Sequence, residues 1–420
     1  MATEDIAGTL SALAKEMYPD DEIGNTLMKG SAIYAEMPKS WDGGGRYERV
    51  PVKYASTSGS GNDFAEAQAA HDEAQRVAFE VPWYDDFSLY RLSDKAIQGC
   101  RGDEHAMADA LQEVGDDAMD TIQRNMHWAL WRNGGGARGQ IASGSGTDTI
   151  KLVDIEDIVH FQVNDLLESY NTDGSAVTTG DGEYLRVYSL SEDDGTLTLA
   201  AGTWGSSGNF QANDYLFKRG TIGKAVVGIS GIIPATAPTA TLFWAVDRSR
   251  APNALGGVRL DALASDGTIE NYLIRAASRL KRNKGQPSHC YLNPVDFGQL
   301  VSELGDKVHY EKYMPTNSKG MQLQGHIGFD HIVVAVGSGL IKVYAEADVP
   351  YGRVYLLTMK GWRIRGMKQP GLLMADGLAM ARGSNFPGYE GRMGCFWHIR
   401  TNAPGHNLTG DISAVQAPAP

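Results

Sequence analysis

Residues 103–132 read DEHAMADALQEVGDDAMDTIQRNMHWALWR, and this stretch predicts the longest element of the chain. Apolar residues recur in it every three or four positions, which places them on one stripe of an α-helix. They are Met107, Ala110, Leu111, Val114, Ala118, Ile122, Met126, Ala129 and Leu130. The opposite face is mainly acidic, and the glycine run 134–136 can end the helix. At about 1.5 Å per residue the helix is roughly 45 Å long, about two to three times the mean length.

Two alternating segments before this helix predict a long β-hairpin. RYERVPVKY at 46–54 and QRVAFEVP at 75–82 each alternate polar and apolar residues, as half-buried strands do. Between them lie the flexible sequence STSGSGN at 56–62 and a polar, alanine-rich piece at 63–73. Because such a hairpin is marginally stable alone, it either packs on its own subunit or finds its partner surface on a neighbouring chain.

The segments after the long helix predict a second helix and a small β insert. IEDIVHFQVNDLLESY at 155–170 places apolar residues on a helical stripe, with Asp154 as its N-cap. Short strands are expected at 183–190, 196–200 and 214–218, and Asp194-Gly195 predicts a hairpin turn between the first two. We expect these strands to form an antiparallel insert at about 176–220.

The remaining sequence predicts a mixed α/β region followed by strands. One helix is expected at 265–283, capped by Ser265 or Asp266, and another at 294–304. Strands are expected at 226–233, 290–292, 332–336, 341–345, 354–358, 362–364 and 395–400, and residues 372–380 are weakly helical or irregular. Residues 1–40 carry a short helical stripe but too little apolar content for their own core, and the tail 416–420 is expected to be exposed.

The composition favours a folded protein of two or three regions. The chain has 420 residues, 42% of them hydrophobic, and no apolar run long enough to cross a membrane. No signal peptide is expected, and the three widely spaced cysteines, Cys100, Cys290 and Cys395, fit a reducing cytoplasm. The net charge of −13 argues against a dedicated nucleic-acid binder, although not against a surface that encloses nucleic acid.

No catalytic or metal-binding pattern stands out. The sequence lacks a phosphate-binding loop, a dinucleotide-binding glycine motif, a metalloprotease motif and a nucleophile elbow. The acidic turn 191–195 lacks the spacing of a calcium loop, and His326 and His331 are best explained as structural histidines. We therefore expect no enzyme activity, no cofactor and no metal site. A homo-oligomeric enzyme with a spatially assembled acidic site stays open, because one sequence does not reveal such a cluster.

The order of these parts resembles the major capsid proteins of tailed bacteriophages, which have the HK97-type fold. The shared layout is a loose N-terminal arm, a glycine-tipped hairpin, a long helix, a β insert, a mixed α/β domain and closing strands around DVPYGRVYLLTMKGWRIRG at 348–366. The nearest local matches are Tyr291-Leu292-Asn293-Pro294, where a strand leads into a helix, and Asp348-Val349-Pro350 before the late strands. The resemblance implies an α+β fold with peripheral and axial domains.

The resemblance also divides the chain into regions. Residues 1–44 would form the N-terminal arm, and residues 45–92 the extended loop (E-loop) that lies over a neighbouring subunit. Residues 93–225 would form the peripheral domain, with the spine helix 103–132 and the β insert as an addition. Residues 226–360 would form the axial domain, and residues 361–420 the closing strands of the peripheral domain and the C-terminal tail.

By this resemblance the chain would be a structural protein of the virion, made in the cytoplasm of a bacterial host. Its hexamers and pentamers would assemble into an icosahedral head that encloses double-stranded DNA without sequence specificity, with no membrane. A scaffolding protein, where one is used, would be a separate chain, because no long charged N-terminal coiled coil is present; portal and decoration proteins would be further partners. Side chains expected to contact a neighbouring subunit are Arg46, Arg49, Lys53, Tyr54, Arg76 and Phe79.

A β-rich surface protein is the other alternative that stays open. The long helices and the absence of a signal peptide argue against it, and a cleaved secretory precursor would favour it.

Overall fold

The computed structural model describes residues 31–99, 104–177, 180, 182–205, 208–305, 332–336, 339–373, 378–383, 385 and 387–416, without the side chains of 104–110 and 335–336. Helices and strands are mixed along the chain, which confirms the expected α+β class. The chain separates into two compact units. The first unit contains residues 1–234, 239–250 and 361–402, and the second contains residues 235–238, 251–360 and 403–420.

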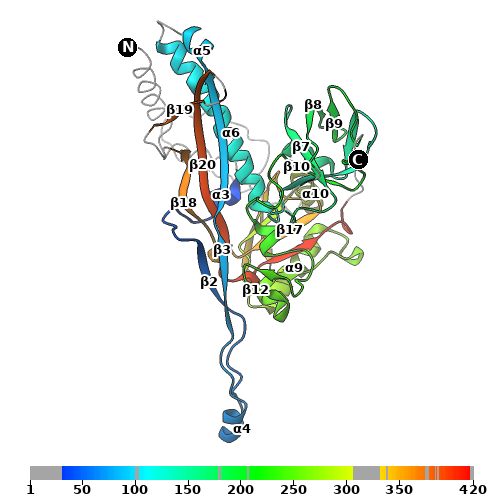
Figure 1. Ribbon diagram of the computed structural model, residues 1–420. Coiled ribbons are helices and arrows are strands. Elements are labelled where there is room, and N and C mark those ends of the chain that lie inside the picture. The colour runs from blue at the N-terminus through cyan, green and yellow to red at the C-terminus, as the bar shows by residue number, and fades with distance from the viewer. Residues whose placement is uncertain are drawn as a thin grey trace, which may run out of the picture. The chain divides into compact units, whose positions relative to one another are not determined.

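The first unit contains a sheet in the order β1-β18-β20-β19, in which β4 also pairs with β20 (Figure 1). Its strands are β1 (Lys39–Ser40), β4 (Tyr84–Ser93), β18 (Trp362–Leu372), β19 (Met380–Arg382) and β20 (Gly388–Thr401). β18 and β20 extend well beyond the expected strands 362–364 and 395–400. Their length follows from pairing between distant segments, because β4 pairs with β20 over its whole length.

The predicted long helix is present as α6 (Glu104–Trp131), with 28 residues, and it packs against β4. Its stripe is confirmed where side chains are described, since Leu111, Ile122 and Met126 are at most 2% exposed. The short helices α3 (Ala32–Glu36) and α5 (Asp94–Gly99) also belong to this unit. α6 ends before Gly134, whose φ of +91° favours glycine.

The predicted hairpin is confirmed as β2 (Tyr47–Lys53) and β3 (Arg76–Pro82), which pair antiparallel from Tyr47↔Pro82 to Lys53↔Arg76. We call these two strands the stalk and residues 55–75 the tip. The tip contains the short helix α4 (Phe64–Ala69), capped by the Asp63 side chain, and Figure 1 shows α4 at the far end of the hairpin. The buried side chains of the hairpin all lie in its stalk, and the tip has none.

The β insert is a closed antiparallel barrel in the order β10-β5-β6-β9-β8-β7. The expected strands 183–190, 196–200 and 214–218 are confirmed as β8 (Leu185–Ser191), β9 (Thr196–Leu199) and β10 (Tyr215–Lys218). The barrel begins earlier than expected, however, with β5 (Ala137–Ser143), β6 (Thr149–Leu152) and β7 (Leu166–Tyr170). Its interior is filled by large apolar side chains, among them Trp204, Phe210 and Leu216.

The helix expected at 155–170 is wrong. Residues Ile155–His160 form a single 3₁₀ segment, η1, and β7 follows. Asn164 takes a left-handed φ of 71°, and the Asp165 carboxylate accepts a hydrogen bond from the Gln162 N–H at 2.9 Å, so the chain turns here. On the expected helical stripe Val163 is 52% exposed, so burial does not follow a helical period.

The expected strand 226–233 is also wrong. Its residues Ile229–Ile232 form the short helix α7, which contacts α6 in the first unit. A glycine sets this close approach, because a Cβ at Gly228 would lie 2.2 Å from the Ala129 carbonyl oxygen. The residues that follow form the small ribbon of β11 (Leu242–Phe243) and β12 (Val246–Asp247) and the 3₁₀ segment η2 (Arg248–Arg250).

The second unit is a mixed sheet in the order β13-β21-β17-β14-β16-β15, with helices α9 and α10 packed on it. The core between them includes Leu273, Leu300, Val343 and Leu356. The strands are β13 (Val258–Arg259), β14 (His289–Leu292), β15 (Ile332–Val336), β16 (Gly339–Ala345), β17 (Arg353–Leu357) and β21 (Leu408–Asp411). The other elements are α8 (Pro252–Gly256), η3 (Ala264–Asp266), α9 (Ile269–Arg282), α10 (Pro294–Leu304) and η6 (Pro404–His406), while η5 (Met359–Gly361) spans the boundary.

The helix expected at 265–283 begins later than its sequence suggests. Its N-cap is Thr268, whose hydroxyl accepts a hydrogen bond from the Asn271 N–H, rather than Ser265 or Asp266. Asp266 instead forms an ion pair with Arg275, at 2.6 Å, across the first turns of α9. The helix 294–304 is confirmed without change, with Asn293 as its cap.

Some expectations concern residues outside the described part of the chain. These are the helical stripe before residue 31, Cys100, His326, His331, residues 374–377 and residues 417–420. Of the tail 416–420 only the first residue is described, and this one residue is not exposed as expected. Gln416 is half-buried, and its Nε2 donates a hydrogen bond to Asp296 Oδ1 at 2.5 Å.

A glycine in β20 allows an aromatic ring to lie across the sheet, and replacing it is expected to be costly. Gly391 pairs with Tyr90, and a Cβ at Gly391 would lie only 2.0 Å from the Tyr90 ring. We expect Gly391→Ala to lower the free energy of unfolding by about 1–3 kcal/mol, the usual cost of overpacking. Gly44→Ala is the control, because a Cβ at Gly44 meets nothing within 4 Å. Equal urea midpoints for both variants would contradict this packing.

Candidate assembly interface

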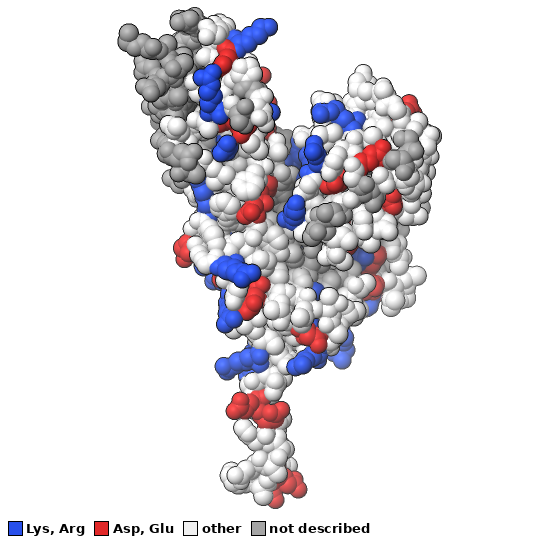
Figure 2. Space-filling view, in the orientation of Figure 1, with Lys and Arg blue, Asp and Glu red and all other residues white. Residues whose placement is uncertain are grey.

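The predicted contact residues divide into exposed and buried side chains. Arg46, Arg49, Lys53 and Arg76 are exposed, and Tyr54 is half-buried. Arg49 forms a surface ion pair with Glu80 at 2.8 Å. The structure thus brings basic side chains together along the stalk, as Figure 2 shows near the middle of the hairpin.

Phe79 differs from the other predicted contact residues because it is buried within its own chain. It is 4% exposed, and its ring lies edge-on to Phe243 and Trp244, at 6.3 Å from each. Trp244 also accepts a hydrogen bond at its backbone oxygen from the Glu80 N–H. Phe79 therefore attaches β3 to the small ribbon of the same chain.

A half-buried ionic cluster attaches the other strand of the stalk. Glu48 on β2 lies 2.9 Å from Nε2 of His398, 3.1 Å from Nε of Arg400 and 3.5 Å from Nε of Arg365. We call this set the Glu48 cluster. Burial lowers the pKa of His398 to about 4, although Glu48 favours its charged form. His398 is therefore neutral near pH 7. Glu48 then forms ion pairs with one guanidinium group on each of two strands, Arg365 on β18 and Arg400 on β20.

The tip has a one-sided charge and an exposed aromatic ring. It carries Asp63, Glu66, Asp72 and Glu73 and no lysine or arginine. Phe64, the first residue of α4, is 82% exposed. The hairpin thus presents an acidic end beyond its basic stalk, and Figure 2 shows this change of charge.

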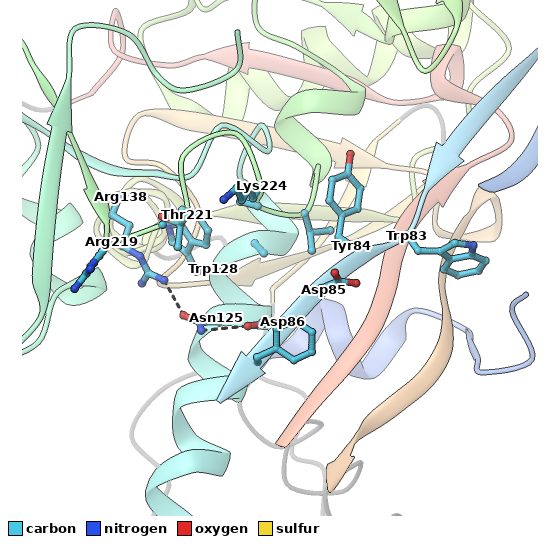
Figure 3. A pocket seen from close by; sticks show the side chains of 15 residues that line it. Trp83, Tyr84, Asp85, Asp86, Asn125, Trp128, Arg138, Arg219, Thr221 and Lys224 are labelled. Carbon is cyan, nitrogen blue, oxygen red and sulfur yellow. Dashed lines mark hydrogen bonds between the residues drawn. The ribbon is translucent and has the colours of Figure 1, made fainter. Parts of the chain in front are cut away.

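A pocket of about 550 Å³ lies within the first unit (Figure 3). Trp83 and the first residues of β4 line one side, α6 supplies Asn125 and Trp128, and the segment after β10 supplies Arg219 and Lys224. Figure 3 shows the carboxylates of β4 and these two basic residues coming from different sides of the pocket. The walls therefore carry charges of both signs.

A chain of polar side chains crosses this pocket. The Arg138 guanidinium on β5 donates to Asn125 Oδ1 at 2.7 Å and to the His160 carbonyl oxygen, and Asn125 Nδ2 donates to Asp86 Oδ1 at 3.4 Å. Arg138 is 2% exposed and also lies over the Trp128 ring, 4.6 Å from its centroid. Burial raises the pKa of Asp86 to about 7, although Asn125 and Arg138 favour its charged form.

The sequence patterns did not point to these residues. Glu48 lies on the same face of its alternating strand as Val50 and Val52, but its partners His398, Arg365 and Arg400 are more than 300 positions away in the sequence. Asp86, Asn125 and Arg138 likewise come from three separate elements. The sequence feature that could have pointed to an interface is the change from basic to acidic residues along the hairpin, between Lys53 and Arg76.

Two further features are absent from the described residues. In that part of the chain, no group of three or more His, Cys, Asp or Glu side chains is placed to hold a metal ion. Among the same residues, no helix combines the length and the apolarity that a membrane crossing requires.

Comparisons with known proteins give distant structural similarities. No family model matches the chain, and no curated protein matches it. The cyanophage A-1(L) capsid is 11% identical, covers 91% of each chain and has a TM-score of 0.47. The capsid of an empty GTA particle is 9% identical, with 91% of this chain and 96% of that one covered and a TM-score of 0.44. A virus-like particle from Pyrococcus furiosus is 7% identical, with 94% and 98% covered and a TM-score of 0.39.

Proposed function

We propose that the chain is a structural protein, the major capsid subunit of a tailed phage, which self-assembles into the icosahedral head. The observation that carries this proposal is the hairpin tip, which has no buried side chain in the chain taken alone. Ordering a residue costs roughly 1–2 kcal/mol of backbone entropy, and burial normally offsets that cost. A partner surface on a neighbouring subunit would supply the missing burial.

The firm attachment of the stalk supports an arm with a defined direction. Phe79 holds β3 to the ribbon at Phe243 and Trp244, and the Glu48 cluster holds β2 to β18 and β20. The stalk packs against its own subunit but the tip does not, so the tip can contact a different surface on a neighbouring subunit. Such head-to-tail contacts build rings or larger assemblies rather than closed pairs. Hexamers and pentamers of a shell are rings of this kind.

The regions of the chain follow from this proposal. Residues 1–44 are the N-terminal arm and the hairpin within 45–92 is the extended loop. Residues 93–225, with the spine helix α6, are the proposed peripheral domain and residues 226–360 the proposed axial domain. Residues 361–420 are the proposed closing strands of the peripheral domain and the C-terminal tail. Exposed Arg46, Arg49, Lys53 and Arg76, with Tyr54 beside them, are the proposed contacts of the stalk with a neighbour.

The acidic composition suits a wall that encloses double-stranded DNA without sequence specificity. A net charge of −13 disfavours tight binding to phosphates, which would hinder movement of the genome. The proposed location is therefore the virion, after assembly in the cytoplasm of a bacterial host. Separate scaffolding, portal and decoration proteins are proposed partners, and no enzymatic role is proposed.

Removal of the tip tests this function directly. Ala55 and Gln75 are joined by backbone hydrogen bonds, so residues 56–74 can be replaced by Asn-Gly, which favours a tight hairpin turn. We expect the shortened chain to keep its thermal midpoint, because no buried side chain is removed, and to lose only the contribution of α4 from its far-ultraviolet circular dichroism. We expect its assemblies to disappear in sedimentation velocity. Assemblies of unchanged size would refute a role for the tip.

A further inference from the structure

Two basic residues at the pocket are available to a partner. Arg219 and Lys224 are both exposed, and neither forms an ion pair with a described residue. The Arg219 guanidinium lies 4.5 Å from the centroid of the Tyr184 ring, which holds it beside the barrel. Arg138, by contrast, is buried and already donates to Asn125 and to His160. The exposed positive charge of the pocket therefore lies on the segment after β10.

The opposite wall offers an apolar contact. Phe87 on β4 is 50% exposed and lines the pocket, and its ring lies edge-on to Phe396 at 5.9 Å. Asp85 and Asp86 also lie on this wall, so it would repel the negatively charged groups of a ligand. A ligand that fits both walls must carry negative charge on one side and an aromatic group on the other.

The hairpin tip has this combination. Phe64 and Glu66 are two positions apart on α4, which separates their directions by about 200° around the helix. One side chain can therefore face Phe87 while the other faces Arg219 and Lys224. The remaining acidic residues of the tip add to the attraction, and no basic residue of the tip opposes it.

The tip of the same chain is held away from this pocket. Trp83 lines the pocket, and β3 runs from there to Arg76 as a continuous strand paired with β2. At about 3.3 Å per residue, the eight residues from Trp83 to Gln75 place the start of the tip roughly 26 Å along the stalk. The occupant that fits is therefore the tip of a second copy.

We propose that the acidic hairpin tip of one subunit docks at this pocket of the next, with Glu66 at Arg219 and Lys224 and Phe64 against Phe87. This assignment rests on the proposed shell function and names the surface that receives the arm. Donor and acceptor are different surfaces of one chain, so each subunit can give one tip and receive another.

Charge reversal tests this pairing. The variants are Glu66→Arg at the tip and Arg219→Glu at the pocket, each alone and then combined in one chain, with Lys151→Glu as the control. Lys151 is an exposed basic residue of the same barrel that does not line the pocket. We expect each single reversal to raise the protein concentration needed for assembly about tenfold or more, as loss of a close charge pair at an interface does. We expect the combined chain to recover most of this loss and the control to match the parent.

The outcomes separate this inference from the function on which it rests. A parent chain that assembles, with an Arg219→Glu variant that assembles at the same concentration, would overturn the pocket assignment alone. Two impaired single variants without recovery in the combined chain would also overturn it, provided that thermal unfolding shows all variants folded. A parent chain that never assembles would overturn both the pocket assignment and the shell function.

Discussion

Replacing Glu48 by glutamine is expected to lower the free energy of unfolding by about 3 kcal/mol, the largest loss among the predicted variants. Glu48 lies within 3.5 Å of nitrogen atoms of His398, Arg400 and Arg365, and its side chain is 18% exposed. Glutamine keeps the shape but not the charge, so Arg400 loses its counter-ion and Arg365 keeps only Asp42, at 3.1 Å. Breaking a buried ionic cluster on one side typically costs about 3–5 kcal/mol, and partial exposure places our estimate at the lower end.

The same hairpin supplies the control for this variant. Glu80→Gln removes the partner of Arg49, but that ion pair lies at the surface, with the arginine side chain 66% exposed. Surface pairs contribute about 0–1 kcal/mol, so this variant should unfold close to the parent. Urea unfolding of both variants at pH 7 gives the comparison. A Glu48→Gln midpoint equal to that of Glu80→Gln would show that the Glu48 cluster does not hold the stalk.

Replacing Asp86 by asparagine is expected to stabilise the chain, and increasingly so as the pH rises. The pKa of Asp86 is raised to about 7 in the folded chain, above the ordinary value of 3.8. Between these values the folded chain holds a proton that the unfolded chain has released, so stability falls as the pH rises toward 7. At about 1.4 kcal/mol per pKa unit the full penalty is about 4 kcal/mol. Asparagine carries no such penalty, so we expect a gain of about 3 kcal/mol at pH 8 and almost none near pH 4.

The neighbouring carboxylate is the matched control for this pH dependence. Asp85 lines the same pocket but is exposed, so Asp85→Asn should change stability by no more than about 0.5 kcal/mol at any pH. Unfolding free energies of both variants and the parent, measured from pH 4 to pH 8, check the prediction. Parallel curves for the Asp86→Asn variant and the parent would show that Asp86 does not titrate in the folded chain as proposed.

Local periodicity was enough to predict the elements whose burial follows it. α6 and α10 each bury one stripe, and the stalk strands alternate, so their positions agree with the sequence within a few residues. Residues 155–170 show where this reasoning fails. Their apolar spacing suits a helix, but a left-handed Asn164 and pairing with β8 and β10, which both come later in the sequence, make η1 and β7 instead. Pairing partners of this kind are not visible in a local window.

The candidate site was predicted only in part, because its residues come from segments that are far apart in the sequence. The exposed basic residues of the stalk could be expected because a polar position on an isolated hairpin faces solvent. Phe79 could not, since its burial depends on Phe243 and Trp244, more than 160 positions later. Arg219, Lys224 and Phe87 meet at one pocket only because the barrel, β4 and α6 fold together.

The measurement that tests the central claim most directly is negative-stain electron microscopy of the purified chain over a range of protein concentrations. The account predicts closed shells, tubes, or hexameric and pentameric rings in the parent, and isolated subunits in the chain with residues 56–74 replaced. A uniform small particle that does not grow with concentration would contradict a shell subunit.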